Sequence, residues 1–340
     1  MPKQKNAAKS RNVTAQQVAD LAGVSLSAVS RAFTPGASSS SRTREKVMKA
    51  ADALGYQPNV MARSLMTGRT ELIGLVSNNF DNPAFMEIFD LFSRKLQDNG
   101  LRPLLVNLSG NSEPMKAVAM LRQYNVDAVI IASSTVSKAF IDGCLSAQIP
   151  LVHAFGKASK AGTHVVGVNN VQGGKVAAQT LTELGYRRMA FLGGPQSASS
   201  TIDRLKGFRS GLGAQGLSPV STVFAQSYAH DDGRKMMRAL LAEHQLDAVF
   251  CGDDILAIGA LDACNEAGLA VPGMIGVLGF NDITMAAWAA YNLSTIRQPI
   301  ADIIVAAVER AMQLVENPDI EPAHQRFACE VVLRGTLRTA

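Results

Sequence analysis

The chain has 340 residues, of which 47% are hydrophobic and 18% charged, and its formal net charge is +5. These values are ordinary for a globular protein with room for more than one domain. No apolar run approaches the roughly 20 residues of a membrane-spanning helix, and the basic N-terminus lacks an apolar signal-peptide core, so we expect a cytoplasmic protein.

The cysteines indicate no metal site. They are scattered, without C-x-x-C spacing or neighbouring histidines, at Cys144, Cys251, Cys264 and Cys329. This spacing predicts buried, reduced thiols, and we expect neither a metal nor a cofactor.

Positive charge is concentrated near the N-terminus. Residues 1–70 contain 11 lysine and arginine residues against 3 acidic ones, whereas residues 71–340 contain 22 against 25. A basic head on a slightly acidic body indicates that only the head meets a polyanion. We expect residues 1–12 to be a disordered basic tail, which either adds unspecific phosphate affinity or is simply solvated.

Residues 13–57 carry the pattern of a helix-turn-helix domain. Thr14 opens a T-x-x-Q capping box at the start of a first helix, and Gly23 supplies the tight turn after it. Ser25 caps a short second helix with one apolar and one polar, basic side, which fits a major groove. A third helix at about 41–54 completes a small core. An ordinary helical hairpin shares the first two helices, so the pattern favours a DNA reader without deciding it.

Residues 58–70 are a linker with a short helical segment. Pro58 and Asn59 favour a helix start, and residues 60–66 would fill two turns. So short a helix is marginal alone in water, and we expect it to fold only when a surface packs against it. An exposed flexible tether is the alternative.

Residues 13–65 resemble the LacI/GalR (lactose-repressor-type) family of bacterial transcription regulators. The matching motifs are, in order, VTAQQVADLAGVSLSAVSR, TREKV, LGYQPN and ARSL, and the likeness continues through nearly the whole remaining chain. The resemblance implies a homodimer on a pseudo-palindromic double-stranded DNA operator, with the linker helices paired in the minor groove.

The resemblance also implies which side chains meet DNA. Leu26, Ser27 and Arg31 would read base edges, and Leu65 would wedge into the central base step. The complete set is Thr14, Ser25, Leu26, Ser27, Ser30, Arg31, Asn59, Ala62, Arg63 and Leu65.

Beyond residue 70 the hydrophobic periodicity changes. Short apolar runs alternate with helical patterns, which predicts parallel sheets covered by helices on both faces. One series runs from LIGLVS (72–77) to PLVHA (150–154), and a second from VVGVNN (165–170) to IGVLGF (275–280). We therefore predict an α/β body (71–340) of two Rossmann-like subdomains of the periplasmic-binding-protein type.

The family resemblance implies that this body is threaded discontinuously. The chain would cross between the subdomains near Val168, Thr295 and Phe327. The first subdomain then comprises about 71–167 and 297–326, and the second about 168–296 and 327–340.

Polar residues follow several predicted strands, where open parallel sheets collect ligands. The resemblance places them in a cleft between the subdomains and assigns effector binding to Asn82, Phe85, Asn169, Arg204, Asp253, Asn281 and Gln298. Amides, a carboxylate and a guanidinium suit a sugar or sugar acid, because each hydroxyl both donates and accepts. Asp254 either joins this set or caps the helix that it precedes.

Some residues depart from the family pattern. Ala28 replaces a usual threonine in the second helix, and Ala84 replaces a common aromatic, which leaves more room over the ligand. Asn169 and Asn281 replace usual aspartates, so the cleft is two units less negative than the pattern. We therefore hypothesise an effector with a negative charge.

Two other function classes compete with an operator-binding regulator. A sugar-binding receptor module fits the body but leaves the basic head unexplained. An enzyme is disfavoured, because no G-x-G-x-x-G follows the first strand and no P-loop or catalytic triad is evident. The C-terminal residues lack a heptad pattern, which favours a dimer over a coiled-coil tetramer.

Overall fold

A computed structural model describes residues 13–34, 36–57, 64, 67–110, 113–157 and 163–339. The chain divides into two compact units, Met1–Thr70 and Glu71–Ala340.

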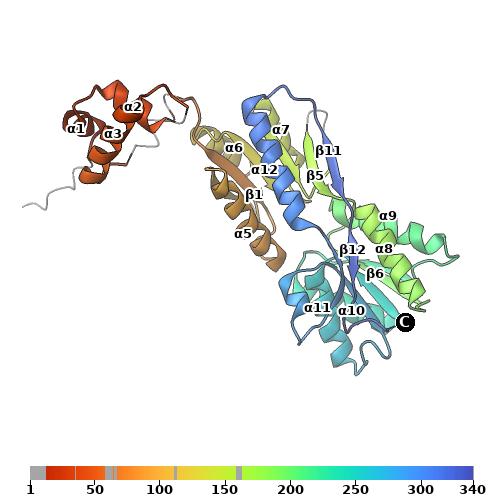
Figure 1. Cartoon of the computed structure of the whole chain (residues 1–340). Coiled ribbons are helices and arrows are strands. Elements are labelled where there is room, and N and C mark those ends of the chain that lie inside the picture. The colour runs from red at the N-terminus through yellow and green to blue at the C-terminus, as the bar shows by residue number, and fades with distance from the viewer. Residues whose placement is uncertain are drawn as a thin grey trace, which may run out of the picture. The chain divides into compact units, whose positions relative to one another are not determined.

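The described part of the first unit contains the helices α1 (Ala15–Ala22), α2 (Leu26–Phe33) and α3 (Ser41–Leu54) (Figure 1). The capping box is formed at α1, where Gln17 N donates to Thr14 Oγ1 at 3.3 Å and Thr14 N donates to Gln17 Oε1 at 2.9 Å. Gly23 ends α1 in the left-handed region, with a φ of 64°, which glycine adopts without steric cost.

The three helices share a small apolar core. Its buried members are Val18, Ala19, Val29, Ala32, Val47, Ala50 and Ala51. Phe33 and Tyr56 close one side with an edge-on ring contact at 5.7 Å between centroids. The helix-turn-helix prediction for this part of the chain is confirmed.

The second unit holds two six-stranded sheets. The first has the order β11-β5-β4-β3-β1-β2, and all of its pairings are parallel. Its strands are β1 (Leu72–Ser77), β2 (Arg102–Asn107), β3 (Ala128–Ala132), β4 (Leu151–Ala154), β5 (His164–Val168) and β11 (His324–Phe327). The helices of this subdomain are α5 (Pro83–Asp98), α6 (Pro114–Gln123), α7 (Lys138–Ser146) and α12 (Ile300–Glu316).

The second sheet has the order β12-β10-β9-β8-β6-β7, and only its edge strand β12 pairs antiparallel. Its strands are β6 (Met189–Gly193), β7 (Ser221–Phe224), β8 (Ala248–Cys251), β9 (Gly276–Asn281), β10 (Ser294–Arg297) and β12 (Glu330–Val332). Its helices are α8 (Asn170–Glu183), α9 (Ser199–Gly213), α10 (His230–Glu243), α11 (Asp254–Glu266) and the 3₁₀ turn η1 (Thr284–Ala287). The two-subdomain α/β architecture is thus as predicted.

The position of β5 separates two expectations. By periodicity the run VVGVNN opens the second series, whereas the family resemblance extends the first subdomain to about residue 167. β5 pairs with β4 and β11 in the first sheet. Because buried strands of both sheets are equally apolar, periodicity cannot assign β5 to either. The chain leaves the first sheet after β5, returns to that subdomain with α12 and β11, and adds β12 to the second sheet.

Helices α8 and α9 lie side by side at very close range (Figure 1). Glycines permit this approach. A Cβ atom on Gly174 would lie 2.1 Å from the carbonyl oxygen of Arg204, and one on Gly207 would lie 2.0 Å from that of Val171. The contact fixes α9, which carries part of the site described below, against its own subdomain.

All four cysteines are buried and free, as expected. Burial raises the pKa of the Cys144, Cys264 and Cys329 thiols to about 12. Among the described residues, no group of His, Cys, Asp and Glu side chains is arranged to hold a metal ion. The described helices are too short or too polar to cross a membrane.

Candidate functional site

The outward side of α2 combines apolar and polar side chains. Leu26 is 49% exposed, and Ser27 and Arg31 are exposed beside it, while Val29 faces the core. Ser25 caps the helix by accepting from Ala28 N at 3.3 Å. An exposed leucine at the start of a short, cationic helix is available for contact with another molecule.

The remaining residues assigned to DNA contact divide into two groups. Thr14 caps α1, and Ser30 is partly buried, its carbonyl accepting from Thr34 Oγ1 at 2.9 Å. The other members lie outside the described residues, and they are Asn59, Ala62, Arg63 and Leu65.

A cavity lies between the two subdomains of the second unit. Six of the seven residues expected to bind an effector line it, namely Asn82, Phe85, Arg204, Asp253, Asn281 and Gln298. They come from the ends of strands and the starts of helices in both sheets, as the strand-end argument predicted.

Asp253 is the centre of the cavity's polar network. Its carboxylate, 4% exposed, accepts from Asn82 Nδ2 at 3.2 Å and from Asn281 Nδ2 at 2.9 Å. It also caps α11 by accepting from Ile255 N at 3.0 Å. Burial raises the pKa of Asp253, and these hydrogen bonds and the nearby Arg204 charge oppose that rise. Because Asn82 belongs to the first subdomain, its bond to Asp253 ties the subdomains together.

Gln298 extends this network to the crossover after β10. Its Nε2 donates to Asn281 Oδ1, whereas its buried Oε1 has no hydrogen-bond partner among the described residues. A buried acceptor without a donor costs about 1–3 kcal/mol. The Gln298 carbonyl therefore suits a hydroxyl group brought by a ligand.

The Arg204 side chain is held by two hydrogen bonds and a ring contact. Its Nε donates to Asn170 Oδ1 at 2.8 Å, its Nη1 to the carbonyl of Gly252 at 2.5 Å, and its guanidinium carbon lies 3.6 Å from the ring centroid of Phe280. Burial lowers the pKa of Arg204, and Tyr228 and Asp253 act in the opposite direction. The guanidinium is thus a preorganised cation at the cavity wall.

A hydroxyl cluster, which the sequence did not reveal, forms another wall. Tyr228 Oη lies 3.1 Å from Ser200 Oγ and 3.0 Å from Thr201 Oγ1. Ser200 Oγ in turn lies 3.0 Å from Ser134 Oγ of the first subdomain. Of these, Ser134 follows the end of β3 and could have been found by the strand-end rule, whereas Ser200 and Tyr228 carry no comparable signal.

Asn169 lies apart from the other six residues. It is exposed, does not line the cavity, and caps α8 by accepting from Gln172 N at 3.0 Å. The next residue, Asn170, reaches inward to Arg204 instead. Of the two asparagine replacements, only Asn281 therefore changes the charge of the cavity.

Asp253, and not Asp254, caps α11. Asp254 is fully buried, and it accepts from Thr295 Oγ1 at 2.5 Å and Ile283 N at 2.9 Å. Ala84 lines the cavity, and it also packs into an apolar cluster of the second subdomain.

The cavity between the subdomains is small, at about 50 Å³. Ligand pockets are commonly several hundred Å³. The facing side chains of the two subdomains therefore leave less space than such a ligand needs.

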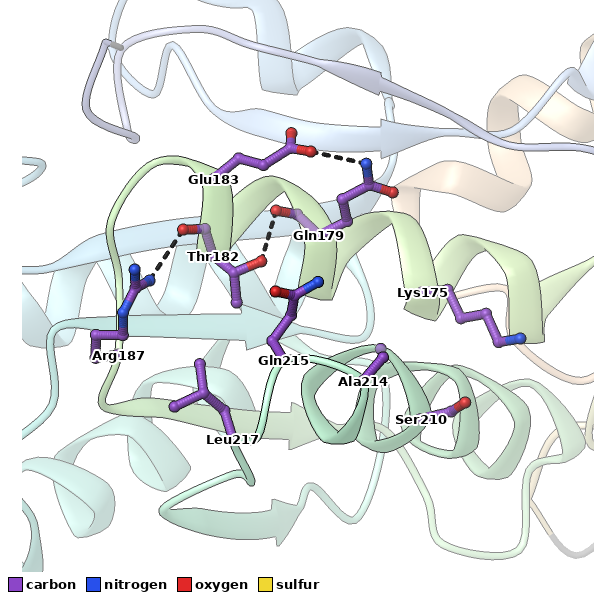
Figure 2. A pocket seen from close by; sticks show the side chains of 10 residues that line it. Lys175, Gln179, Thr182, Glu183, Arg187, Ser210, Ala214, Gln215 and Leu217 are labelled. Carbon is purple, nitrogen blue, oxygen red and sulfur yellow. Dashed lines mark hydrogen bonds between the residues drawn. The ribbon is translucent and has the colours of Figure 1, made fainter.

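A larger hollow of about 500 Å³ lies elsewhere, over the α8–α9 groove (Figure 2). Its polar groups bond mainly to each other: Gln179 Nε2 donates to Glu183 Oε1 at 2.7 Å, and Arg187 Nη1 donates to the carbonyl of Thr182 at 2.9 Å. None of its lining residues is buried. It is a surface groove without converging, desolvated groups.

Comparison with known proteins matches both units. Residues 14–59 match the family "Bacterial regulatory proteins, lacI family", and residues 178–337 match "Periplasmic binding protein-like domain". The sucrose operon repressor of Pediococcus pentosaceus is 32% identical over 304 residues, which cover 88% of this chain and 91% of that protein. The chain belongs to the LacI family.

Other relatives agree. The transcriptional regulator CelR of Thermobifida fusca is 32% identical over 298 residues, covering 85% of this chain and 88% of that protein. A crystal structure of the lac repressor dimer bound to operator and the anti-inducer ONPF superposes with a TM-score of 0.86 at 25% identity, over 96% of this chain and all of that one. A CelR–cellobiose complex gives 0.73 at 26% identity, with the same coverage.

This LacI-family chain is therefore a DNA-binding transcriptional regulator with a ligand-binding domain, and its homologues are regulators and not enzymes.

Proposed function

We propose that the protein is a repressor that binds a pseudo-palindromic operator as a homodimer and responds to a sugar or sugar acid held between its subdomains. One observation supports the effector site above all. A continuous hydrogen-bond chain runs from Gln298 through Asn281 and Asp253 to Asn82, linking the crossover strand to both subdomains.

The chemistry of this chain fits a polyol. One sugar hydroxyl can donate to the unpaired Gln298 Oε1, and another can donate to the Asp253 carboxylate while accepting from the Asn82 amide. Phe85, which also lines the cavity, offers an apolar face for the ring. Two relatives support a sugar-type effector, one named as a sucrose operon repressor and one solved with cellobiose.

The same chain explains how a ligand would act. Asn82 of the first subdomain bonds Asp253 of the second. A ligand that replaces this bond interacts differently with the open and closed forms and so shifts their populations. In a dimer, subdomain movement alters the spacing of the two linker segments and their ability to fold on DNA, which couples the two binding events.

On the DNA side, we assign base contacts to Leu26, Ser27 and Arg31, and phosphate contacts to Ser25, Ser30 and the α1 cap Thr14. Ser25, Leu26, Ser27 and Arg31 are supported by their exposure at the start and along one side of α2, whose other side packs into the head's core. A sugar-receptor function would not explain this exposed, basic surface.

Fluorescence anisotropy on DNA from upstream of the protein's own gene tests the proposal. We expect specific binding to a two-fold symmetric site, a steep loss of affinity with salt, and a shift in affinity with one member of a panel of sugars and sugar acids. Release identifies an inducer, and tightening a corepressor. Binding with no sequence preference at any salt concentration would leave a sugar-receptor body as the better account.

A further inference from the structure

An ion pair joins the two subdomains beside the effector cavity. Lys157, three residues beyond the end of β4, places its Nζ 2.6 Å from Asp203 Oδ1 on α9. The Asp203 side chain is only 14% exposed, whereas that of Lys157 is 46% exposed. The cation thus comes from the first subdomain and the carboxylate from the second.

A second cation lies beside this ion pair. Arg326 of β11 donates from Nη1 to the carbonyl of Gly156 at 3.1 Å, next to Lys157 in the chain. The first subdomain therefore holds two cations in this region, and Lys157 is the one paired with Asp203.

This group of charges lies next to the polyol site. Phe155, two residues before Lys157, lines the cavity. On the facing helix α9, Ser200 and Arg204 also line it, and Asp203 sits between them in the sequence. Because Lys157 and Asp203 belong to different subdomains, separation of the subdomains would withdraw Asp203 with α9 and leave the Lys157 ammonium without this partner.

We propose that Lys157 and Arg326 form the binding subsite for a carboxylate group of the effector, and that Asp203 occupies this subsite when no effector is bound. The effector is then a sugar acid, with its hydroxyls on the Asn82–Asp253–Asn281–Gln298 chain. The inference rests on the proposed effector cleft and specifies its ligand class.

Exchange of the two carboxylates is energetically accessible. Ion pairs with an exposed partner contribute little net stability, because water screens them and ordering a lysine side chain costs entropy. A ligand carboxylate can therefore replace Asp203 as the partner of the Lys157 ammonium at little cost in free energy. Asn281, which also lines the cavity, is an uncharged amide and does not repel such a ligand.

Calorimetry on the full-length protein tests the subsite with matched pairs of ligands, galacturonate with galactose and glucuronate with glucose. We expect one acid to bind at least fivefold more tightly than its neutral partner. Lys157→Met should lower the affinity for that acid at least fivefold and change the affinity for the neutral sugar less than twofold. Asp203→Asn, which removes the competing charge, should tighten the acid at least threefold.

Lys138→Met is the matched control, because Lys138 forms a similar exposed pair with Asp142 within α7, away from the cavity. It should alter neither affinity. If neutral sugars bind and Lys157→Met has no selective effect, the subsite is wrong and the proposed function stands. If no acid binds at all, the subsite is likewise wrong. Acid binding through Lys157 by a protein that binds no operator would uphold the subsite and overturn the proposed repressor.

Discussion

Asp254 shows how one buried carboxyl group can hold three segments together. From the first turn of α11 it accepts from Thr295 of β10 and from Ile283 in the loop after β9. A Cβ atom on Gly279 would lie 2.2 Å from its Oδ1, so glycine is required for this approach. Burial raises the pKa of Asp254 from 3.8 to about 7, against these hydrogen bonds.

The raised pKa predicts a pH dependence of stability. Between pH 4 and 7 the folded protein retains this proton while the unfolded chain releases it, so the free energy of unfolding falls as pH rises through that window. In wild type the free energy of unfolding should decrease between pH 5 and pH 8. We expect this decrease to be smaller in Asp254→Asn, by at most about 3 kcal/mol. Urea unfolding followed by circular dichroism measures it.

Only the change with pH is compared, because asparagine also loses one acceptor and lowers stability at every pH. Asp90→Asn, at an exposed position paired with Arg94, is the control and should keep the wild-type pH dependence. Equal pH dependence in Asp254→Asn and wild type would show that Asp254 is ionised throughout this range.

At the scale of elements, the α8–α9 contact predicts opposite effects for two glycines of one helix. Gly207→Ala would place a methyl group against the backbone of Val171 and should lower the free energy of unfolding by about 3 kcal/mol. A Cβ atom on Gly213 would have no other atom within 4 Å. Gly213→Ala should therefore leave the free energy of unfolding unchanged or raise it by up to about 1 kcal/mol, since alanine favours the helix. Similar losses in both variants, by urea unfolding, would argue against the close packing.

The second helix of the head predicts a separation of DNA binding from stability. Leu26→Ala removes an exposed side chain and should weaken operator binding at least tenfold, with little change in thermal unfolding. Met48→Ala is the control, because Met48 is exposed to a similar degree, at 41%, but lies on α3. Equal operator affinity in Leu26→Ala and Met48→Ala, measured by anisotropy, would remove Leu26 from the proposed interface.

At the scale of the whole molecule, the order of elements could be predicted because hydrophobic periodicity, capping residues and glycines are local signals. The capping box at Thr14 and the turn at Gly23 formed as expected. Periodicity alone could not assign β5 to a sheet, because its residues are apolar like those of every buried strand, whereas the resemblance placed the crossing after it, near Val168.

The site could be predicted where side chains follow strands. The rule placed Asn82, Asp253 and Asn281 at the cavity. It also pointed to the pair Asn169 and Asn170, of which the resemblance selected Asn169. In the structure Asn169 caps α8 and Asn170 bonds Arg204, and the sequence does not say which of the two caps. The rule missed Tyr228, whose position depends on the fold of the loop before α10.

The central claim is that the cleft and the operator are coupled through Asp253. The most direct test is operator affinity by anisotropy, with and without the identified effector, in wild type and in Asp253→Asn. Wild type should show at least a tenfold shift in Kd on adding effector, and Asp253→Asn should show less than a twofold shift at the same effector concentration. An undiminished shift in Asp253→Asn would contradict the account, because the effector would then act from another site.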